Sequence, residues 1–228
     1  MKISSIYPSM EASAKMLPEN TNIKLILRHS FRPSLHNSPN HEDVRLTPDG
    51  IRSAKEFGRS IEFKIGELHS SIVPRCVETI QSIMTFRDEK RNIILSKNIL
   101  SDVFAIDRTK ADISFKTIGS LKKIVFLLKN KITPSGFRDI DDIISMILDY
   151  IFLSSSKNSL DIYCTHDLQL ALLYSVLFAD QPSIKDIESE WPNMLEGMFF
   201  YGQRSDFVCI WRTRVKRFQN FYLKDFEQ

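Results

Sequence analysis

A short apolar run that stops abruptly at two basic residues constrains the fold of this chain more than any other feature. Residues 23–27, Ile-Lys-Leu-Ile-Leu, are rich in β-branched and large aliphatic side chains, a pattern that predicts a buried strand. The run ends on Arg28 and His29. Residues 33–48 then hold three of the nine prolines together with Asn, Ser and His, which predicts a long loop rather than a regular element.

Strand and helix patterns alternate along the rest of the chain. Thr47 followed by Pro48 predicts the N-cap and first turn of a helix that runs through about Glu62. Further strands are predicted at 65–69, 92–95 and 160–164, with three closing strands around 198–201, 207–211 and 218–223. Helices are predicted after Arg75, in two segments over 115–155 broken near 133–136, and over 168–178. This alternation predicts an α/β fold, a three-layer α/β/α sandwich with a mostly parallel central sheet.

The domain organisation that follows is simple. Residues 1–21 are polar and aperiodic, so we expect a flexible N-terminal lead. Residues 22–228 are expected to form one domain, because a chain of this length can bury a sizeable core without dividing. The helices at about 115–155 are expected to form an insertion over the sheet.

Composition excludes several classes of protein. Hydrophobic residues make up 43% of the chain and charged residues 26%, values typical of globular domains, and the formal net charge is only +3. Three cysteines without metal-type spacing argue against a disulfide framework or a structural metal site. There is no signal peptide and no apolar run long enough to cross a bilayer, so we expect a cytoplasmic protein without a membrane partner.

One segment near the C-terminus has two interpretations. Residues 211–218, Trp-Arg-Thr-Arg-Val-Lys-Arg-Phe, interleave basic and aromatic side chains, which is one recipe for binding single-stranded nucleic acid. The same pattern is typical of an edge hairpin with charged residues pointing outward. We favour the hairpin, and expect no nucleic-acid partner.

The candidate catalytic and binding side chains follow the predicted strands directly. In α/β sheets, ligands bind at the carboxyl ends of the strands. The side chains at three such ends are Arg28, His29 and Arg32; Ser71 and Arg75; and His166 with Asp167. Several cationic side chains around one crevice repel one another unless an anion binds between them. Phosphate suits such a site, because a guanidinium group can donate hydrogen bonds to two of its oxygens at once. A histidine that is neutral near pH 7 can attack phosphorus, and a nearby carboxyl can protonate the leaving oxygen.

Four landmarks in order across residues 23–178 resemble the histidine phosphatase superfamily. The first is the apolar strand that ends in Arg-His-Gly, here Leu25-Ile26-Leu27-Arg28-His29-Ser30. The second is Leu-Thr-x-x-Gly at the start of a helix, here Leu46-Thr47-Pro48-Asp49-Gly50. The third is Ser-x-x-x-Arg-Cys-x-x-Thr, which spans Ser71 to Thr79, and the fourth is the strand-terminal His166.

The resemblance implies a phosphoglycerate mutase-like fold and a role for each matched residue. His29 would accept the phosphoryl group, and no metal or organic cofactor is implied. The residues that would hold the phosphate oxygens are Arg28, Arg32, Arg75 and His166. Arg32 and the His-Asp pair resemble the acid phosphatase branch, which makes Asp167 the expected proton donor. Asp102, near the place where the mutase branch carries its acid, and Glu196 are reserve candidates.

These roles predict hydrolysis of a phosphomonoester, carried by a phosphorylated small molecule or a phosphoprotein. A phosphoryl-transferring mutase and a phosphate-binding module without turnover are the alternatives. Ser30 departs from the usual glycine, and would be strained if the backbone there had a positive φ. His36, His41 and His69 receive no catalytic role from the sequence.

Overall fold

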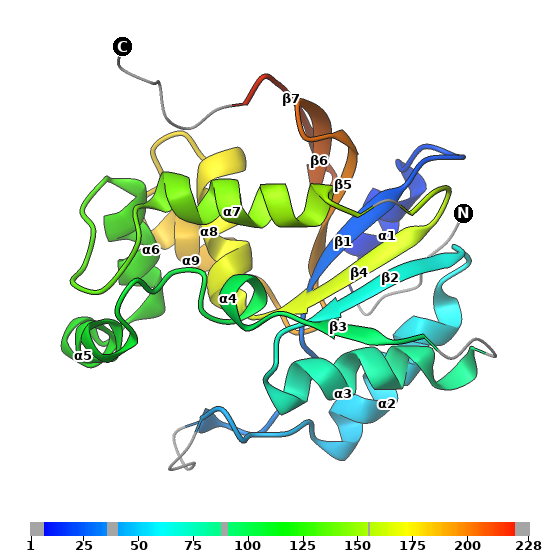
Figure 1. Cartoon of the computed structure of the whole chain (residues 1–228), viewed down its shortest axis with the longest axis horizontal. Coiled ribbons are helices and arrows are strands. Elements are labelled where there is room, and N and C mark those ends of the chain that lie inside the picture. The colour runs from blue at the N-terminus through cyan, green and yellow to red at the C-terminus, as the bar shows by residue number, and fades with distance from the viewer. Residues whose placement is uncertain (1–6, 36–40, 88–90, 155, 222–228) are drawn as a thin grey trace.

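The computed structural model describes residues 7–35, 41–87, 91–154 and 156–221. These residues form one seven-stranded sheet with helices on both faces (Figure 1). The strands are β1 (Ile23–Arg28), β2 (Ile65–Ser70), β3 (Ile93–Leu95), β4 (Leu160–Thr165), β5 (Gly197–Gln203), β6 (Asp206–Trp211) and β7 (Arg214–Gln219). The helices are α1 (Pro8–Lys15), α2 (Pro48–Ser60), α3 (Pro74–Ile83), α4 (Lys97–Leu100), α5 (Arg108–Ile118), α6 (Leu121–Lys129), α7 (Ile140–Phe152), α8 (Asp167–Leu177) and α9 (Ile184–Ser189).

The sheet is mixed, with the strand order β3-β2-β4-β1-β5-β6-β7. The pairings β3-β2, β2-β4 and β4-β1 are parallel, whereas β1-β5, β5-β6 and β6-β7 are antiparallel. Because β6 is antiparallel to β5, it runs in the same direction as β1, and only β5 and β7 oppose the other strands. The predicted three-layer α/β/α fold is confirmed, with its parallel half formed by the four strands that precede α8.

Side chains alternate between the two faces of the sheet and form a core on each. Leu25 and Leu27 of β1 pack into the core under α1, α2 and α3, whereas Ile26 between them packs into the core under α6, α7 and α8. The same alternation places Ile162 and Tyr163 of β4 in opposite cores. Strands β1 and β4 are therefore buried on both faces, as the continuous apolar runs in the sequence predict.

Two glycines of α2 let backbone segments approach the helix closely. A Cβ on Gly50 would lie 2.1 Å from the Phe31 carbonyl oxygen, in the loop that follows β1. A Cβ on Gly58 would lie 2.0 Å from the Ile83 carbonyl oxygen, at the end of α3. The predicted N-cap is confirmed, since Thr47 Oγ1 accepts a hydrogen bond from the Gly50 amide at 3.0 Å. Helix α2 is thus fixed against both the loop and α3.

Three expectations about the elements are corrected. Residues 8–15 form helix α1 rather than a flexible lead, because Met10 and Ala14 are buried in the core against the sheet. The predicted insertion contains three helices rather than two, and starts at Arg108, since Gly119 at φ 70° ends α5 and Ser120 caps α6. The last strand covers residues 214–219, earlier than predicted, and residues 222 and 223 of the predicted strand lie outside the described residues.

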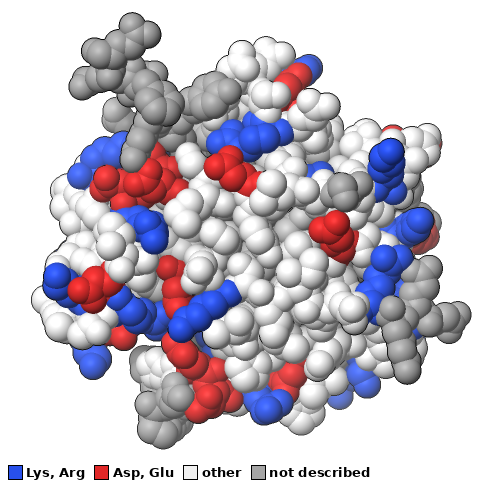
Figure 2. Space-filling view, viewed as in Figure 1, with Lys and Arg blue, Asp and Glu red and all other residues white. Residues whose placement is uncertain are grey.

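The C-terminal basic and aromatic segment forms the predicted edge hairpin. Strand β7 pairs only with β6 at one end of the sheet, and Arg217 forms an ion pair with Asp206 across the hairpin. On the face of the molecule shown in Figure 2, basic and acidic side chains are interspersed. None of the helices in the described ranges is long and apolar enough to cross a bilayer.

Candidate active site

The carboxyl ends of the parallel strands bring the sequence landmarks together at one edge of the sheet. His29 follows β1, and its amide donates to the Thr165 carbonyl at the end of β4 at 3.0 Å. Ser71 follows β2, and its amide donates to the Cys164 carbonyl at 2.9 Å. His166 follows β4 directly, and the His29 and His166 ring centroids are 5.5 Å apart. Residues far apart in the sequence therefore share one site.

The two ring nitrogens of His29 have different hydrogen-bond partners. The side chain is buried, and Nδ1 lies 2.8 Å from the Ser30 carbonyl oxygen. Nε2 accepts a hydrogen bond from Arg75 Nε at 3.1 Å, so Nε2 carries the lone pair and Nδ1 the proton. Burial holds the pKa of the His29 imidazole well below its usual range, and His166 and the guanidinium groups of Arg75 and Arg28 lower it further. His29 is thus a neutral imidazole with Nε2 as the potential nucleophile.

Two arginines near His29, Arg32 and Arg75, have no carboxylate partner among the described residues. Arg75 donates through Nη1 to the His41 carbonyl at 2.8 Å, and Arg32 donates through Nη1 to the Pro33 carbonyl at 2.8 Å. Among the described residues neither forms an ion pair with Asp or Glu, and burial lowers the pKa of both. The Nε of Arg32 is buried without a hydrogen-bond acceptor. Uncompensated guanidinium groups of this kind favour a bound anion.

His166 is oriented by a chain of hydrogen bonds that the sequence did not reveal. Arg75 Nη2 lies 3.3 Å from His166 Nδ1, and because arginine only donates, the imidazole proton is on Nε2. Nε2 lies 3.0 Å from Ser71 Oγ, which in turn lies 2.7 Å from Ser101 Oγ. Ser71 was recognised as part of a landmark, whereas Ser101 is brought in by the segment after β3. The ring of His166 is therefore fixed on both sides.

Asp167 begins helix α8 and faces the same site. Its Oδ2 forms an ion pair with Arg28 Nη2 at 2.8 Å, and its Oδ1 accepts from the Leu168 amide at 3.0 Å. Arg28 is buried and donates through Nη1 to the Pro192 carbonyl at 2.6 Å. In this arrangement the Arg28 guanidinium, expected from the sequence to hold phosphate, contacts Asp167 and Pro192, and Arg28 is not among the residues that line the cavity.

A cavity of about 740 Å³ opens from these residues toward α5. Its inner end is lined by His29, Arg32, Arg75, His166 and Asp167. Its outer part is lined by side chains from α5 and neighbouring segments, including Phe104, Phe115, Leu121 and Leu168. The volume lies within the range that small-molecule sites occupy, and exceeds what a phosphate alone would fill. The site can therefore hold a phosphorylated group together with the group that carries it.

The reserve acids occupy different environments. Asp102 lines the cavity and is ion-paired to Arg108, which also binds Asp112 and Glu42. Glu196, the other reserve acid, is buried and is not among the residues that line the cavity. Both of its carboxylate oxygens accept hydrogen bonds, from Arg212 and Asn193.

Solved structures share this arrangement of strands and helices, although no protein-family model and no curated protein matches the sequence. A phosphoserine phosphatase from Entamoeba histolytica aligns with a TM-score of 0.51 and 16% identity, over 78% of this chain and 90% of that one. A phosphoglycerate mutase from Bacillus anthracis aligns with a TM-score of 0.53 and 16% identity, over 83% and 91% of the two chains. A mycobacterial glucosyl-3-phosphoglycerate phosphatase aligns with a TM-score of 0.53 and 14% identity, over 86% and 98%.

The chain has the phosphoglycerate mutase fold. The fold that the four sequence landmarks imply is thereby confirmed. In this fold the landmark residues lie at the carboxyl ends of β1, β2 and β4, where the cavity opens.

Ser30 is accommodated in the fold without backbone strain. It is not among the non-glycine residues with positive φ. Its amide donates to Thr79 Oγ1 at 3.0 Å, and its hydroxyl donates to the Gly50 carbonyl at 2.7 Å. The serine thus ties the first landmark to the second and the third.

The remaining histidines divide by position. His69 is buried outside the cavity, where Nδ1 lies 2.9 Å from the Tyr150 hydroxyl and Nε2 lies 3.0 Å from Glu67 Oε2. His41 lines the cavity and supplies its carbonyl to Arg75. His36 lies outside the described residues. Within the described ranges, no cluster of three or more His, Cys, Asp or Glu side chains could hold a metal ion.

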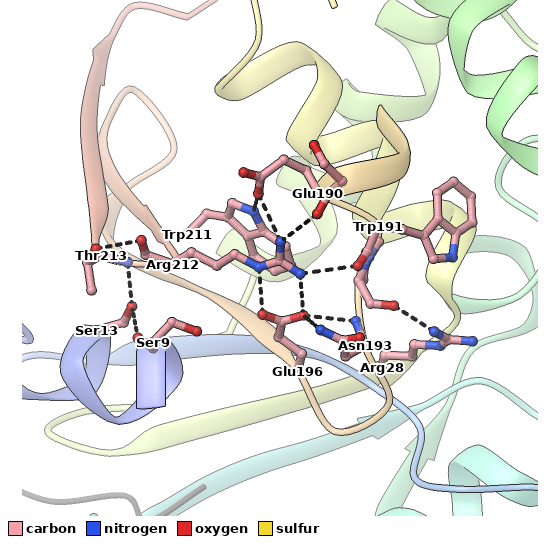
Figure 3. Close-up of polar contacts among 12 residues, drawn as sticks. Ser9, Ser13, Arg28, Glu190, Trp191, Asn193, Glu196, Trp211, Arg212 and Thr213 are labelled. Carbon is pink, nitrogen blue, oxygen red and sulfur yellow. Dashed lines mark hydrogen bonds and ion pairs between the residues drawn. The ribbon is translucent and has the colours of Figure 1, made fainter. Parts of the chain in front are cut away.

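Polar residues that the sequence did not connect to the site surround the C-terminal hairpin (Figure 3). Arg212 in the β6–β7 turn binds Glu196, which precedes β5. Asn193 also binds Glu196, through its amide at 2.8 Å and its side chain at 3.0 Å. Arg212 and Glu196 are 16 positions apart in the sequence and lie in different loops. No local sequence pattern links them, so only the three-dimensional structure reveals this cluster.

Proposed function

We propose that this protein hydrolyses a phosphomonoester through a phosphohistidine formed on Nε2 of His29. The observation that carries the proposal is the state of His29, a buried neutral imidazole whose Nε2 lone pair faces Arg75 while Nδ1 is fixed by the Ser30 carbonyl. A neutral imidazole has the electron pair that attack on phosphorus requires. Arg32 and Arg75 beside it lack carboxylate partners among the described residues, and would neutralise the phosphate.

The first step transfers the phosphoryl group from substrate to enzyme. The Nε2 lone pair forms a bond to phosphorus as the bond between phosphorus and the leaving oxygen breaks. Asp167 donates a proton to that oxygen, so the leaving group departs as an alcohol.

The second step restores the enzyme. Water attacks phosphorus, the Nε2–phosphorus bond breaks, and its electron pair returns to the imidazole. The carboxylate of Asp167 takes the proton from water, and phosphate leaves. The 2.8 Å ion pair with Arg28 Nη2 holds the Asp167 carboxylate in place for this proton transfer.

Fixed positive charges would stabilise the phosphoryl group during both steps. Arg32 and Arg75 are the charged donors that line the inner end of the cavity, and His166 lies beside them with its Nε2–H directed to Ser71 Oγ. Donors held in place before the reaction cost little reorganisation when charge moves onto the phosphoryl oxygens. The Ser71 and Ser101 hydroxyls serve this purpose indirectly, because they fix the ring of His166.

The nucleophile is tested with a generic aryl phosphate. His29→Ala should lower turnover by about a thousandfold or more, because the covalent intermediate cannot form. The matched control is His69→Gln, which alters a second buried histidine that lies outside the cavity and should retain turnover. Wild-type turnover by His29→Ala would refute the mechanism. Tight phosphate binding by the wild type without turnover would instead indicate a binding module.

The acid is tested through the leaving group. Asp167→Asn should slow esters with poor alkyl leaving groups far more than aryl esters, because only a poor leaving oxygen needs the proton. Asp102→Asn is the matched control, since Asp102 also lines the cavity but is bound to Arg108. A selective loss on alkyl esters in Asp102→Asn rather than Asp167→Asn would transfer the role to Asp102.

The substrate panel follows from the cavity and from the solved structures of this fold. The named substrates of two of those proteins, phosphoserine and glucosyl-3-phosphoglycerate, belong in it together with 3-phosphoglycerate and phosphopeptides. Adding an alcohol acceptor separates the two enzymatic outcomes. Release of inorganic phosphate alone supports a hydrolase, whereas transfer to the acceptor as the main reaction would favour a mutase.

A further inference from the structure

Glu196 and Arg212 form a bidentate ion pair whose two members also make several further hydrogen bonds. Arg212 Nε lies 2.8 Å from Glu196 Oε1, and Arg212 Nη2 lies 2.8 Å from Glu196 Oε2 (Figure 3). The Glu196 side chain is 3% exposed and that of Arg212 is 20% exposed. Arg212 also donates to Glu190 Oε2 at 3.1 Å and to the Trp191 carbonyl at 3.1 Å. A bidentate pair of this kind fixes the relative position of the two backbones that carry it.

The backbone on both sides of this pair adopts conformations that disfavour side chains. Leu195 has φ 60°, Arg212 has φ 47° and Thr213 has φ 68°, all in the left-handed region, although none is glycine. Such residues cost free energy that the surrounding contacts must offset, and they concentrate where a side chain has to be aimed. Glycine would fit the two-residue turn of the hairpin better, but only arginine supplies the fork that reaches Glu196.

The pair holds a short segment, residues 191–196, that connects α9 to β5. Arg212 binds the Trp191 carbonyl at one end of the segment, and Glu196 binds the amide and side chain of Asn193 at the other. Pro192 lies between these anchored residues, and its carbonyl accepts from Arg28 Nη1 at 2.6 Å. The position of the Pro192 carbonyl is therefore set by the Glu196–Arg212 pair.

Arg28 links this segment to the candidate active site. Its Nη1 is bound to Pro192, and its Nη2 forms the 2.8 Å ion pair with Asp167 Oδ2. A planar guanidinium bound at both terminal nitrogens has a fixed orientation, so a displaced Pro192 carbonyl would turn the group that holds Asp167. Displacements of about 1 Å can lower rates by about a hundredfold when they move a reacting group.

We propose that Arg212 and Glu196 are positioning residues, which act through Pro192 and Arg28 to hold Asp167 against the leaving oxygen. The proposal rests on the proposed function, in which Asp167 is the proton donor. Neither residue touches substrate, since neither lines the cavity. The competing interpretation is that the pair only stabilises the C-terminal hairpin.

Leaving-group dependence separates the two interpretations. Arg212→Gln should lower kcat/KM for an alkyl phosphate about tenfold more than for an aryl phosphate, because loss of an aligned acid matters only for the poor leaving group. The matched control is Arg217→Gln in the same hairpin. Arg217 forms a bidentate pair with Asp206 at 2.8 and 2.6 Å, and no hydrogen bond among the described residues links this pair to Arg28. It should leave the ratio of the two rates unchanged.

A double-mutant cycle gives the second measurement. In the Asp167→Asn background, Arg212→Gln should cause no further selective loss on the alkyl ester, because its effect passes through Asp167. Arg212→Lys and Glu196→Gln are measured in parallel. Each replaces one member of the pair with a side chain of similar size and keeps the other member, so the test does not depend on the folding of a single variant. Circular dichroism and thermal unfolding identify the folded variants on which the ratios are taken.

The outcomes distinguish failure of this proposal from failure of the proposed function. Equal losses on both esters in the folded variants, or losses that add to those of Asp167→Asn, would overturn the positioning role. If His29→Ala abolishes turnover at the same time, the phosphohistidine mechanism stands, and Arg212 and Glu196 do not position Asp167. If His29→Ala retains turnover, the mechanism itself is wrong.

Discussion

At the scale of single residues, burial of His29 has a consequence for stability as well as for chemistry. The folded protein keeps this imidazole neutral, because burial and its neighbours hold its pKa well below its usual range. In the unfolded chain the same group takes up a proton near pH 6.5. Above about pH 6.5 both states are neutral, and His29 makes no difference to the pH dependence of folding.

Below that pH the two states diverge. As the pH falls from about 6.5 toward the lower pKa of the folded state, the unfolded chain binds a proton that the folded chain does not. The free energy of unfolding should therefore decrease by up to about 1.4 kcal/mol per pH unit on account of His29. Denaturant titrations of wild type and His29→Gln between pH 7 and 5 measure this. In His29→Gln the free energy of unfolding should fall less steeply between pH 7 and 5 than in the wild type. Parallel plots of this free energy against pH for the two proteins would contradict the expectation.

Ser30 provides a second test at this scale. Its hydroxyl donates a buried hydrogen bond to the Gly50 carbonyl, and its backbone is not in the left-handed region. Ser30→Gly should therefore destabilise the protein by about 1–2 kcal/mol, through the lost hydrogen bond and the added freedom of the unfolded chain. Ser30→Ala, which removes only the hydroxyl, separates the two contributions. Stabilisation by glycine in urea unfolding would show that the serine is strained after all.

At the scale of helices and strands, local signals predicted most of the parallel half of the fold. The apolar runs of β1 and β4 and the Thr47–Pro48 cap of α2 are all encoded within a few residues, and each is observed. Helix α1 was missed because its apolar residues are few and its stability comes from packing on the sheet. A propensity argument cannot detect packing against strands that lie some 190 residues further along the chain.

Helix α1 should contribute measurably to folding. Met10 is 2% exposed in the core beside β5 and β6, so Met10→Ala should reduce the free energy of unfolding by about 2–4 kcal/mol. The matched control is Met16→Ala, since Met16 lies just after the same helix but is 45% exposed. Its effect should stay within about 0.5 kcal/mol. Equal and small effects of both substitutions in urea unfolding would mean that α1 is not part of the cooperative unit.

At the scale of the whole molecule, the sequence predicted which residues meet but not how they are bonded. Strand order alone brings His29, Ser71 and His166 to one edge, because parallel strands end together. The partners of those residues come from elsewhere in the fold. Arg28 was expected to face phosphate but is held by Asp167 and Pro192, because the segment before β5 lies beside the end of β1. Such contacts depend on the tertiary arrangement, and no local pattern encodes them.

The outer part of the cavity is likewise a product of the whole fold, because α5 contributes to its lining. Phe115 on α5 lines the cavity and packs against Phe104 and Phe137, with ring centroids 5.3 and 5.1 Å away. An aromatic wall beyond the phosphate end favours substrates whose leaving group is aromatic or apolar, since such contacts contribute about 0.5–1.5 kcal/mol each.

Phe115→Ala should therefore lower kcat/KM for an aryl phosphate up to about tenfold, while inhibition by inorganic phosphate, which needs only the inner end, should be unchanged. The matched control is Ile113→Ala on the same helix, since Ile113 is 59% exposed and does not line the cavity. Steady-state kinetics on aryl and short alkyl esters give both quantities. An equal loss on the two esters, or a weaker inhibition by phosphate, would show that Phe115 shapes the phosphate end rather than the recognition of the leaving group.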